Sequence, residues 1–302
     1  MAESSSDAFI THRSLLFTVA YEMLGSAADA EDVLQESWLR WADADRTEVR
    51  DPRAYLVRIV TRQSLNRLRT LSRRREDYVG QWLPEPLLTS PDVADDIELA
   101  ESVSIALLTV LETLGPTERA VFVLREVFDV PYGEIAEAVG RSAATVRQIA
   151  RRARDHVAAR QPRMKVARSE QQAVVERFLA AMSTGNLQGL MEVMAPDVVM
   201  IADGGGRVAA ALLPLHGVDV VATLLASAKT KVAELATTPV WFNAAPAARI
   251  DFDGEPAAVS VLVDDGRITH IYVTRNPEKL TRIDEEADLD ISSLGTSSPC
   301  GD

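Results

Sequence analysis

The chain has 302 residues, of which 47% are hydrophobic and 25% charged, and its formal net charge is −13. This length is enough for two or three domains, and the composition is that of a globular protein rather than a disordered or fibrous one. The single cysteine, Cys300, excludes a disulfide within the chain, and one Cys with four His residues gives no metal-ligand spacing. Since no apolar run approaches the roughly 20 residues that span a bilayer, we expect a cytoplasmic protein without a membrane contact.

The charge is unevenly distributed along the chain. Residues 45–75 contain ten arginines and three acids, and residues 141–168 contain nine basic residues and one acid. Residues 76–101 hold eight acids and no base, and residues 169–302 carry a net charge of −10. Two basic islands in an acidic chain indicate local contacts with nucleic acid.

Residues 7–76 are predicted to form a helical domain. A helix ends at Gly25, a second covers residues 29–41, and a third runs from Pro52 to about residue 75. The second helix has an acidic face opposite an apolar one, which suits a basic partner surface, although a solvated face with core aromatics is the alternative. The residues of this candidate surface are Asp29, Glu31, Asp32, Gln35, Glu36 and Trp38.

The third helix has a polar face that combines positive charge with hydrogen-bonding groups. Such a face suits phosphates and unstacked bases, with most of the arginines on phosphate. Its candidate residues are Arg58, Arg62, Asn66, Arg67 and Arg69.

Residues 77–101 form an acidic segment with Pro84, Pro86 and Pro91, which predicts a flexible linker in which Trp82 and Leu83 are apolar anchors.

Residues 102–162 are predicted to contain a helix-turn-helix. Ile135 and Val139 mark the apolar stripe of the first helix, and Val146 marks that of the second. Gly140 suits a turn with positive φ, and the second helix then presents a polar and basic face to a major groove. A plain helical hairpin with a basic solvated face is the alternative. The candidate residues are Ser142, which also suits a helix cap, Thr145, Arg147, Gln148, Arg151 and Arg152.

The last third of the chain changes type. Residues 169–283 are predicted to form an α+β domain with an antiparallel sheet, and residues 284–302 a disordered tail. The expected helices cover residues 170–185, 187–195 and 218–229, and the expected strands cover residues 198–202, 207–213, 239–243, 247–252, 257–263 and 268–274. Asp203, His216, Asp251 and His270 are the local candidates for acid–base chemistry, but no pair is identifiable by spacing, and the three glycines after Asp203 are more simply a tight turn.

Several of these motifs resemble those of bacterial RNA polymerase sigma factors of the extracytoplasmic-function (ECF) group. They are residues 29–38, residues 53–62 followed by Asn66, and residues 114–122 followed by the helix-turn-helix. The resemblance implies that the acidic helix binds core RNA polymerase, that the third helix reads the −10 element, and that the helix-turn-helix reads the −35 element. The implied partners are core RNA polymerase, promoter double-stranded DNA and the unpaired non-template strand.

Three further motifs contain Trp82, Leu83 and Pro84, then Asp203, Gly204, Gly205, Gly206 and Arg207, and finally Asn276, Pro277 and Lys279. They resemble the motifs of the ECF subgroup with a C-terminal SnoaL-like domain of the NTF2-like fold, and the resemblance implies a regulatory role for these residues. The chain departs from the subgroup's pattern at Arg207, where Lys is more frequent, and at Glu278, where Asp is usual. Both changes keep the charge.

The sequence therefore predicts two all-α sigma modules followed by an α+β cone domain that regulates them. We expect no enzymatic activity and no cofactor, and a small ligand in the C-terminal domain is left open. The alternative is an NTF2-like small-molecule enzyme or ligand sensor fused to a DNA-binding module.

Overall fold

A computed structural model describes residues 5–45, 49–75, 78–92, 97–160 and 166–289. The chain folds into two compact units. The first comprises residues up to 74, 108–161 and the chain from residue 288, and the second comprises residues 75–107 and 162–287. Among the described residues, none of the helices combines the length and the hydropathy of a membrane span.

Among its described residues, the N-terminal part of the first unit contains the helices α1 (Ser5–Thr11), α2 (Arg13–Leu24), α3 (Ala27–Ala42) and α4 (Pro52–Arg75). Helix α2 is buried from Leu15 to Leu24 and ends, as predicted, at Gly25, whose φ of 69° is left-handed. The side chain of Ser26 caps α3 by accepting a hydrogen bond from the Asp29 amide.

The second part of the first unit contains α7 (Pro116–Phe122), a π-helical turn η3 (Val123–Val127), α8 (Tyr132–Val139) and α9 (Ala143–Ala158). Arg119 of α7 is 1% exposed. It donates one hydrogen bond to the carbonyl of Glu22 at 3.0 Å and another to Glu112 at 2.5 Å. Because a buried guanidinium needs such partners, Arg119 joins α7 to α2 in one core.

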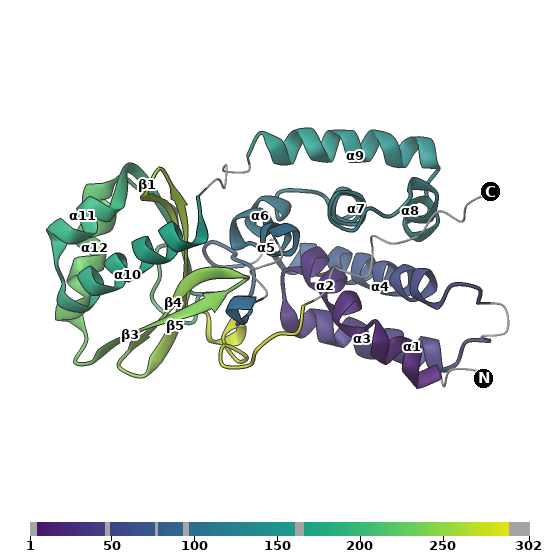
Figure 1. The fold of residues 1–302 in the computed structure, drawn as a ribbon, viewed down its shortest axis with the longest axis horizontal. Coiled ribbons are helices and arrows are strands. Elements are labelled where there is room, and N and C mark those ends of the chain that lie inside the picture. The colour runs from purple at the N-terminus through teal and green to yellow at the C-terminus, as the bar shows by residue number, and fades with distance from the viewer. Residues whose placement is uncertain (1–4, 46–48, 76–77, 93–96, 161–165, 290–302) are drawn as a thin grey trace. The chain divides into compact units, whose positions relative to one another are not determined.

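The second unit is built on one six-stranded sheet with the order β2-β1-β6-β5-β4-β3. The strands are β1 (Met194–Asp203), β2 (Leu215–His216), β3 (Leu235–Phe242), β4 (Ala245–Phe252), β5 (Glu255–Asp264) and β6 (Arg267–Thr274). Helices α10 (Arg168–Thr184), α11 (Leu187–Val193) and α12 (Val218–Lys231) lie together on one side of the sheet (Figure 1). This helix-and-sheet topology, with the two helical modules, confirms the predicted fold class.

The sheet is buried on both faces at β5, and the side chains of this strand show how. Val259 and Val261 face the core under the helices, whereas Leu262 faces a separate apolar cluster with Leu83 and Ile105. Successive residues of a strand point to opposite faces, so a strand buried on both faces reads as an unbroken apolar run. The second face is covered by residues from the segment predicted as a flexible linker and from α6 (Ile105–Leu111).

Two predictions about this sheet are wrong. The sheet is mixed, because β1 pairs in parallel with β6 while the other pairs are antiparallel. Residues 207–213 are not a strand but a loop that leads to the two-residue β2. The alternating apolar residues of that loop gave the β signal, although Gly205 and Gly206 before it turn the chain with φ values of 58° and 69°.

Candidate nucleic-acid interface and linker site

The helix-turn-helix forms through two local devices. Gly140 has a φ of 66°, and its amide closes α8 on the carbonyl of Ala136. Ser142 then caps α9 by accepting a hydrogen bond from the Thr145 amide at 3.2 Å. The predicted turn and cap are both confirmed. The Ser142 and Thr145 hydroxyls also lie 2.9 Å apart, so both groups are engaged at the start of α9.

Helix α9 separates a buried stripe from a basic surface. Val146, Ile149, Ala150, Ala153 and Val157 are buried. The exposed residues include Arg147, Gln148, Arg151 and Arg152. Arg147 lies over the Tyr132 ring at 5.5 Å, and Arg152 is 4.0 Å from Glu118. These loose contacts leave a polar row that can reach base edges and phosphates.

Helix α4 carries the second basic surface, and part of it is engaged inside the first unit. Arg58 donates to the Glu137 carboxylate at 3.1 Å, and Arg62 donates to the Glu137 carbonyl at 2.9 Å. Exposed Asn66 accepts from Arg69 at 3.4 Å. DNA contact by Arg58 and Arg62 therefore requires an exchange of Glu137 for phosphate or base oxygens.

The two surfaces predicted separately on α3 and α4 are linked by Arg67. Its guanidinium contacts Asp29 at 2.6 Å and Asp32 at 2.8 Å. Gln63 of α4 donates to Glu36 at 2.8 Å. Arg67, a predicted DNA contact, is thus paired in this structure with two carboxylates of the acidic helix.

The remaining residues of the acidic helix differ in exposure. Glu31 accepts two hydrogen bonds from Arg13, at 2.9 and 2.8 Å. Trp38 is half-buried and meets the Phe9 ring edge-on at 5.2 Å, while Gln35 is exposed. The face therefore presents Asp32, Gln35 and Glu36 most openly.

In the second unit, a buried ion pair joins β1 to the turn after β6. Asp203, at the end of β1, is fully buried, and Lys279 is 7% exposed. The Lys279 ammonium lies 2.6 Å from the Asp203 carboxylate, and its turn is the short helix η4 (Pro277–Lys279). A buried ion pair is stable only when its other hydrogen-bonding capacity is satisfied.

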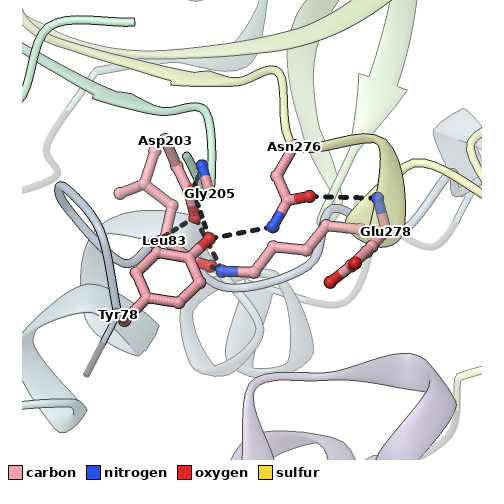
Figure 2. A network of polar contacts seen from close by, with 7 residues as sticks. Tyr78, Leu83, Asp203, Gly205, Asn276 and Glu278 are labelled. Carbon is pink, nitrogen blue, oxygen red and sulfur yellow. Dashed lines mark hydrogen bonds and ion pairs between the residues drawn. The ribbon is translucent and has the colours of Figure 1, made fainter. Parts of the chain in front are cut away.

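The segment before α5 (Ile97–Ser102) supplies the missing partners (Figure 2). The amide of Leu83 donates to Asp203 at 2.9 Å, and its carbonyl accepts from Lys279 at 2.5 Å. The Tyr78 hydroxyl donates to Asp203 at 2.5 Å and accepts from Asn276 at 2.9 Å.

Lys279 also lies over the Trp82 ring, 3.2 Å from its centroid, which is a cation–π contact. The pKa of Tyr78 is raised, mainly by burial and secondly by the hydrogen bond to Asp203. The hydroxyl therefore stays protonated and donates. We call Tyr78, Trp82, Leu83, Asp203, Asn276 and Lys279 the linker network.

A second anchor lies at the turn between β3 and β4. Asn243 is 1% exposed and has a φ of 53°. Its side chain accepts from the Leu87 amide at 3.1 Å and donates to the Val103 carbonyl at 2.9 Å. Beyond it, the Ala287 amide donates to the carbonyl of Leu88 at 2.8 Å. Residues 78–89 therefore lie along the sheet domain as a strap and do not form a free tether.

Comparison with known families identifies the two helical modules. The family Sigma-70 region 2 matches residues 8–74, and the family Sigma-70, region 4 matches residues 104–157. The chain is 36% identical over 285 residues to the ECF RNA polymerase sigma factor SigJ of Mycobacterium tuberculosis, covering 89% of this chain and 91% of that protein. This chain belongs to the ECF RNA polymerase sigma factors.

Further relatives agree with this assignment over most of the chain. The probable ECF RNA polymerase sigma factor SigI of Mycobacterium tuberculosis is 33% identical, and the alignment covers 91% of this chain and 94% of that one. The crystal structure of the SigJ sigma factor superposes with a TM-score of 0.71 at 33% identity, covering 91% of this chain and 98% of the other. The predicted family is therefore confirmed.

The structure brings most of the sigma factor's predicted regulatory residues together. Trp82, Leu83, Asp203, Asn276 and Lys279 meet in the linker network, and buried Pro84 follows directly. Pro277 begins the η4 turn, which the Asn276 side chain caps by accepting from the Glu278 amide. Gly204 accepts at its carbonyl from the Arg207 amide and so closes the glycine turn.

The two departures from the subgroup pattern contact each other. Arg207 and Glu278 form an ion pair at 2.8 Å, with side chains 65% and 66% exposed. Complementary charge is therefore kept when both members change, and such an exposed pair contributes less than about 1 kcal/mol.

Sequence reasoning missed Tyr78 and Asn243. Tyr78 lies four residues before Trp82 in the acidic segment, and the two rings meet edge-on at 4.8 Å. Asn243 precedes Ala244 in a two-residue turn in which both have positive φ. An Asn between two strand-like runs is a turn signal, but the sequence does not indicate that its amide binds a distant segment.

Gly205 allows the linker network to close, and its replacement tests this packing. A Cβ at residue 205 would overlap the Asn276 amide and lie 3.0 Å from the Tyr78 hydroxyl, whereas a Cβ at Gly254, also at positive φ, meets nothing within 4 Å. We expect Gly254→Ala to lower the free energy of unfolding by about 1 kcal/mol, from backbone strain alone, and Gly205→Ala by clearly more. Equal losses in chemical denaturation would contradict the close packing.

Arg67 gives a second prediction. Arg67→Gln removes the ion pairs to Asp29 and Asp32, and because these are partly exposed we expect a loss of up to about 1 kcal/mol of stability. Arg69→Gln, on the exposed side of α4, is the matched control and should change stability by less than about 0.5 kcal/mol. If thermal unfolding of the two variants is the same, Arg67 does not hold α3.

Proposed function

We propose that this sigma factor directs promoter-specific transcription initiation with core RNA polymerase, and that its α+β domain controls the two sigma modules through the strap of residues 78–89. The role in initiation is supported mainly by the exposed polar row on α9, in a chain of the ECF family. This helix is capped by Ser142 and follows the turn at Gly140 that ends α8. The proposed −35 contacts are Ser142, Thr145, Arg147, Gln148, Arg151 and Arg152.

For the other partners we propose a division of the helical surfaces. Asp32, Gln35 and Glu36 are the exposed polymerase contacts on α3, supported by the paired Asp29 and Glu31 and by Trp38. Arg58, Arg62, Asn66 and Arg69 bind the −10 element and the unpaired strand. Arg67 acts mainly by positioning the acidic helix, since both of its carboxylate partners lie there. The place of action is the cytoplasm, where the polymerase acts.

We assign the α+β domain a binding and regulatory role rather than a catalytic one. The domain contains a hollow between α12 and the sheet. None of the acid–base candidates is among the described residues that line this hollow. Asp203 is held by Lys279, and Asp251 is paired with Arg249. These engagements favour regulation over the alternative of an NTF2-like enzyme.

The base-reading role of α9 can be tested by substitution. Arg147→Ala or Arg151→Ala should lower promoter-directed transcription and relax base preference at the upstream element, because one bidentate base contact contributes about 1–3 kcal/mol of discrimination. Arg160→Ala, on an exposed arginine beyond the end of α9, is the control and should weaken binding without changing preference. The measurement is transcription with core polymerase on a randomised upstream element. Uniform weakening across all sequences would instead place Arg147 and Arg151 on phosphate.

The regulatory role can be tested at Lys279. Lys279→Met leaves the buried Asp203 without its ion partner, and breaking such a pair costs about 3–5 kcal/mol. We expect the strap to be released and promoter-directed transcription by the full-length chain to fall. Arg282→Gln, which breaks an exposed pair with Glu285, is the control and should keep wild-type activity. Transcription equal to wild type in Lys279→Met, at matched amounts of folded protein, would contradict regulation through the strap.

A further inference from the structure

The α+β domain contains a hollow of about 550 Å³ between α12 and the sheet. This volume is within the usual range for small-molecule sites, about 300–1,000 Å³. Its walls are mainly apolar and include Met200 and Ala202 of β1, Leu224 of α12 and Val273 of β6. An apolar body would therefore be desolvated there.

The charged residues of the hollow have one sign. Lys231, at the end of α12, and Arg275, just after β6, line it, and no acidic side chain is among the described residues that do so. Arg275 donates to the Ala209 carbonyl at 3.0 Å and lies 3.6 Å from Glu255, and its guanidinium stacks over the Phe252 ring at 4.9 Å. Because Arg275 lines the hollow, its guanidinium presents a fixed positive charge to an acidic group there.

The hollow is joined to the linker network by directly adjacent residues. Ala202 lines it and Asp203 follows; Arg275 lines it and Asn276 follows. The amides of Arg275 and Asn276 both donate to the Asp203 carbonyl, at 2.7 and 3.0 Å. A change at the wall therefore acts on the residues that hold Leu83 and Tyr78.

The loop that replaces the expected strand gives a second connection. Its residues 209–211 line the hollow, and the next residue, Leu212, accepts at its carbonyl from Gln81 at 3.2 Å. Just before this loop, Gly206 lies against Val79 of the strap. A Cβ added to Gly206 would be 3.0 Å from the Val79 Cβ. The loop thus contacts both the hollow and the strap.

We infer that this hollow binds an amphiphilic anion, an apolar chain or ring with a carboxylate or similar acidic head, and that an occupied hollow holds the strap more tightly. The head contacts Lys231 and Arg275, and the body lies against the apolar walls. The ligand shifts the strap toward its docked state because the docked state keeps Ala202, Arg275 and the loop in the positions that line the site. The coupling to the strap rests on the regulatory role proposed above.

Binding is tested with the full-length protein and three probes of equal chain length, decanoate, decanol and decylamine, below their micellar concentrations in titration calorimetry. We expect decanoate to bind tightest. Lys231→Met should weaken decanoate binding by about fivefold or more through the lost charge, while leaving decanol binding unchanged. Lys229→Met, which removes a neighbouring charge that does not line the hollow, is the matched control. Ala228→Leu, which narrows the hollow, should weaken all probes.

Two outcomes of the titration would overturn the assignment. One is no binding of decanoate, and the other is equal affinity for the three probes, since the anionic head would then contribute nothing. A loss of decanoate binding in Lys229→Met as large as in Lys231→Met would also overturn it, because the charge effect would not belong to the hollow.

The coupling is tested by hydrogen exchange of residues 78–89 with and without saturating decanoate. We expect exchange to slow in the wild type and, over a series of decanoate concentrations, the midpoint of this slowing to rise about fivefold or more in Lys231→Met. Binding without a change in exchange would overturn the coupling. Neither measurement uses polymerase or promoter, so failure here is distinguishable from failure of the proposed function in transcription.

Discussion

The buried pair of Asp203 and Lys279 is the interaction on which the second unit depends. Two opposite charges with exposures of 0% and 7% carry a large desolvation penalty, which their mutual attraction offsets only when every remaining hydrogen-bonding position has a partner. Here Leu83 supplies both an amide and a carbonyl, and Tyr78 supplies a hydroxyl. The pair and the strap therefore stabilise each other, because releasing the strap removes three hydrogen bonds from the pair.

This dependence changes the role of the acidic segment between the helical modules. As a free tether it would only raise the effective concentration of one DNA-binding module near the other. As a strap fixed at the linker network and at Asn243, it shortens the chain that is free to move between them. In the regulation proposed above, the state of the α+β domain acts on both modules through this strap. The buried Leu83 adds an apolar contact with Leu262 and Tyr272 on the outer face of the sheet.

Local signals predicted most of the fold, and long-range contacts explain what they missed. Gly25 and Gly140 end helices because of a left-handed backbone, and Ser142 caps α9 through its own neighbour, so sequence alone was enough for the sigma modules. The parallel pairing of β1 with β6 joins segments far apart in sequence, and nothing local encodes it. Residues 207–213 have strand-like composition, but their loop conformation is set by the glycine turn and the strap. The family motifs indicated Asp203 and Lys279, whereas Tyr78 and Asn243 show their role only through partners more than 100 residues away.

The exchange rate of the Leu83 amide in the unliganded full-length chain shows whether the strap is part of the α+β domain in the free protein. That amide donates to a buried carboxylate, so we expect protection comparable to that of amides in the middle of β6. Exchange of Leu83 at the rate of an unstructured peptide, with β6 still protected, would contradict a docked strap and return residues 78–89 to the role of a free linker.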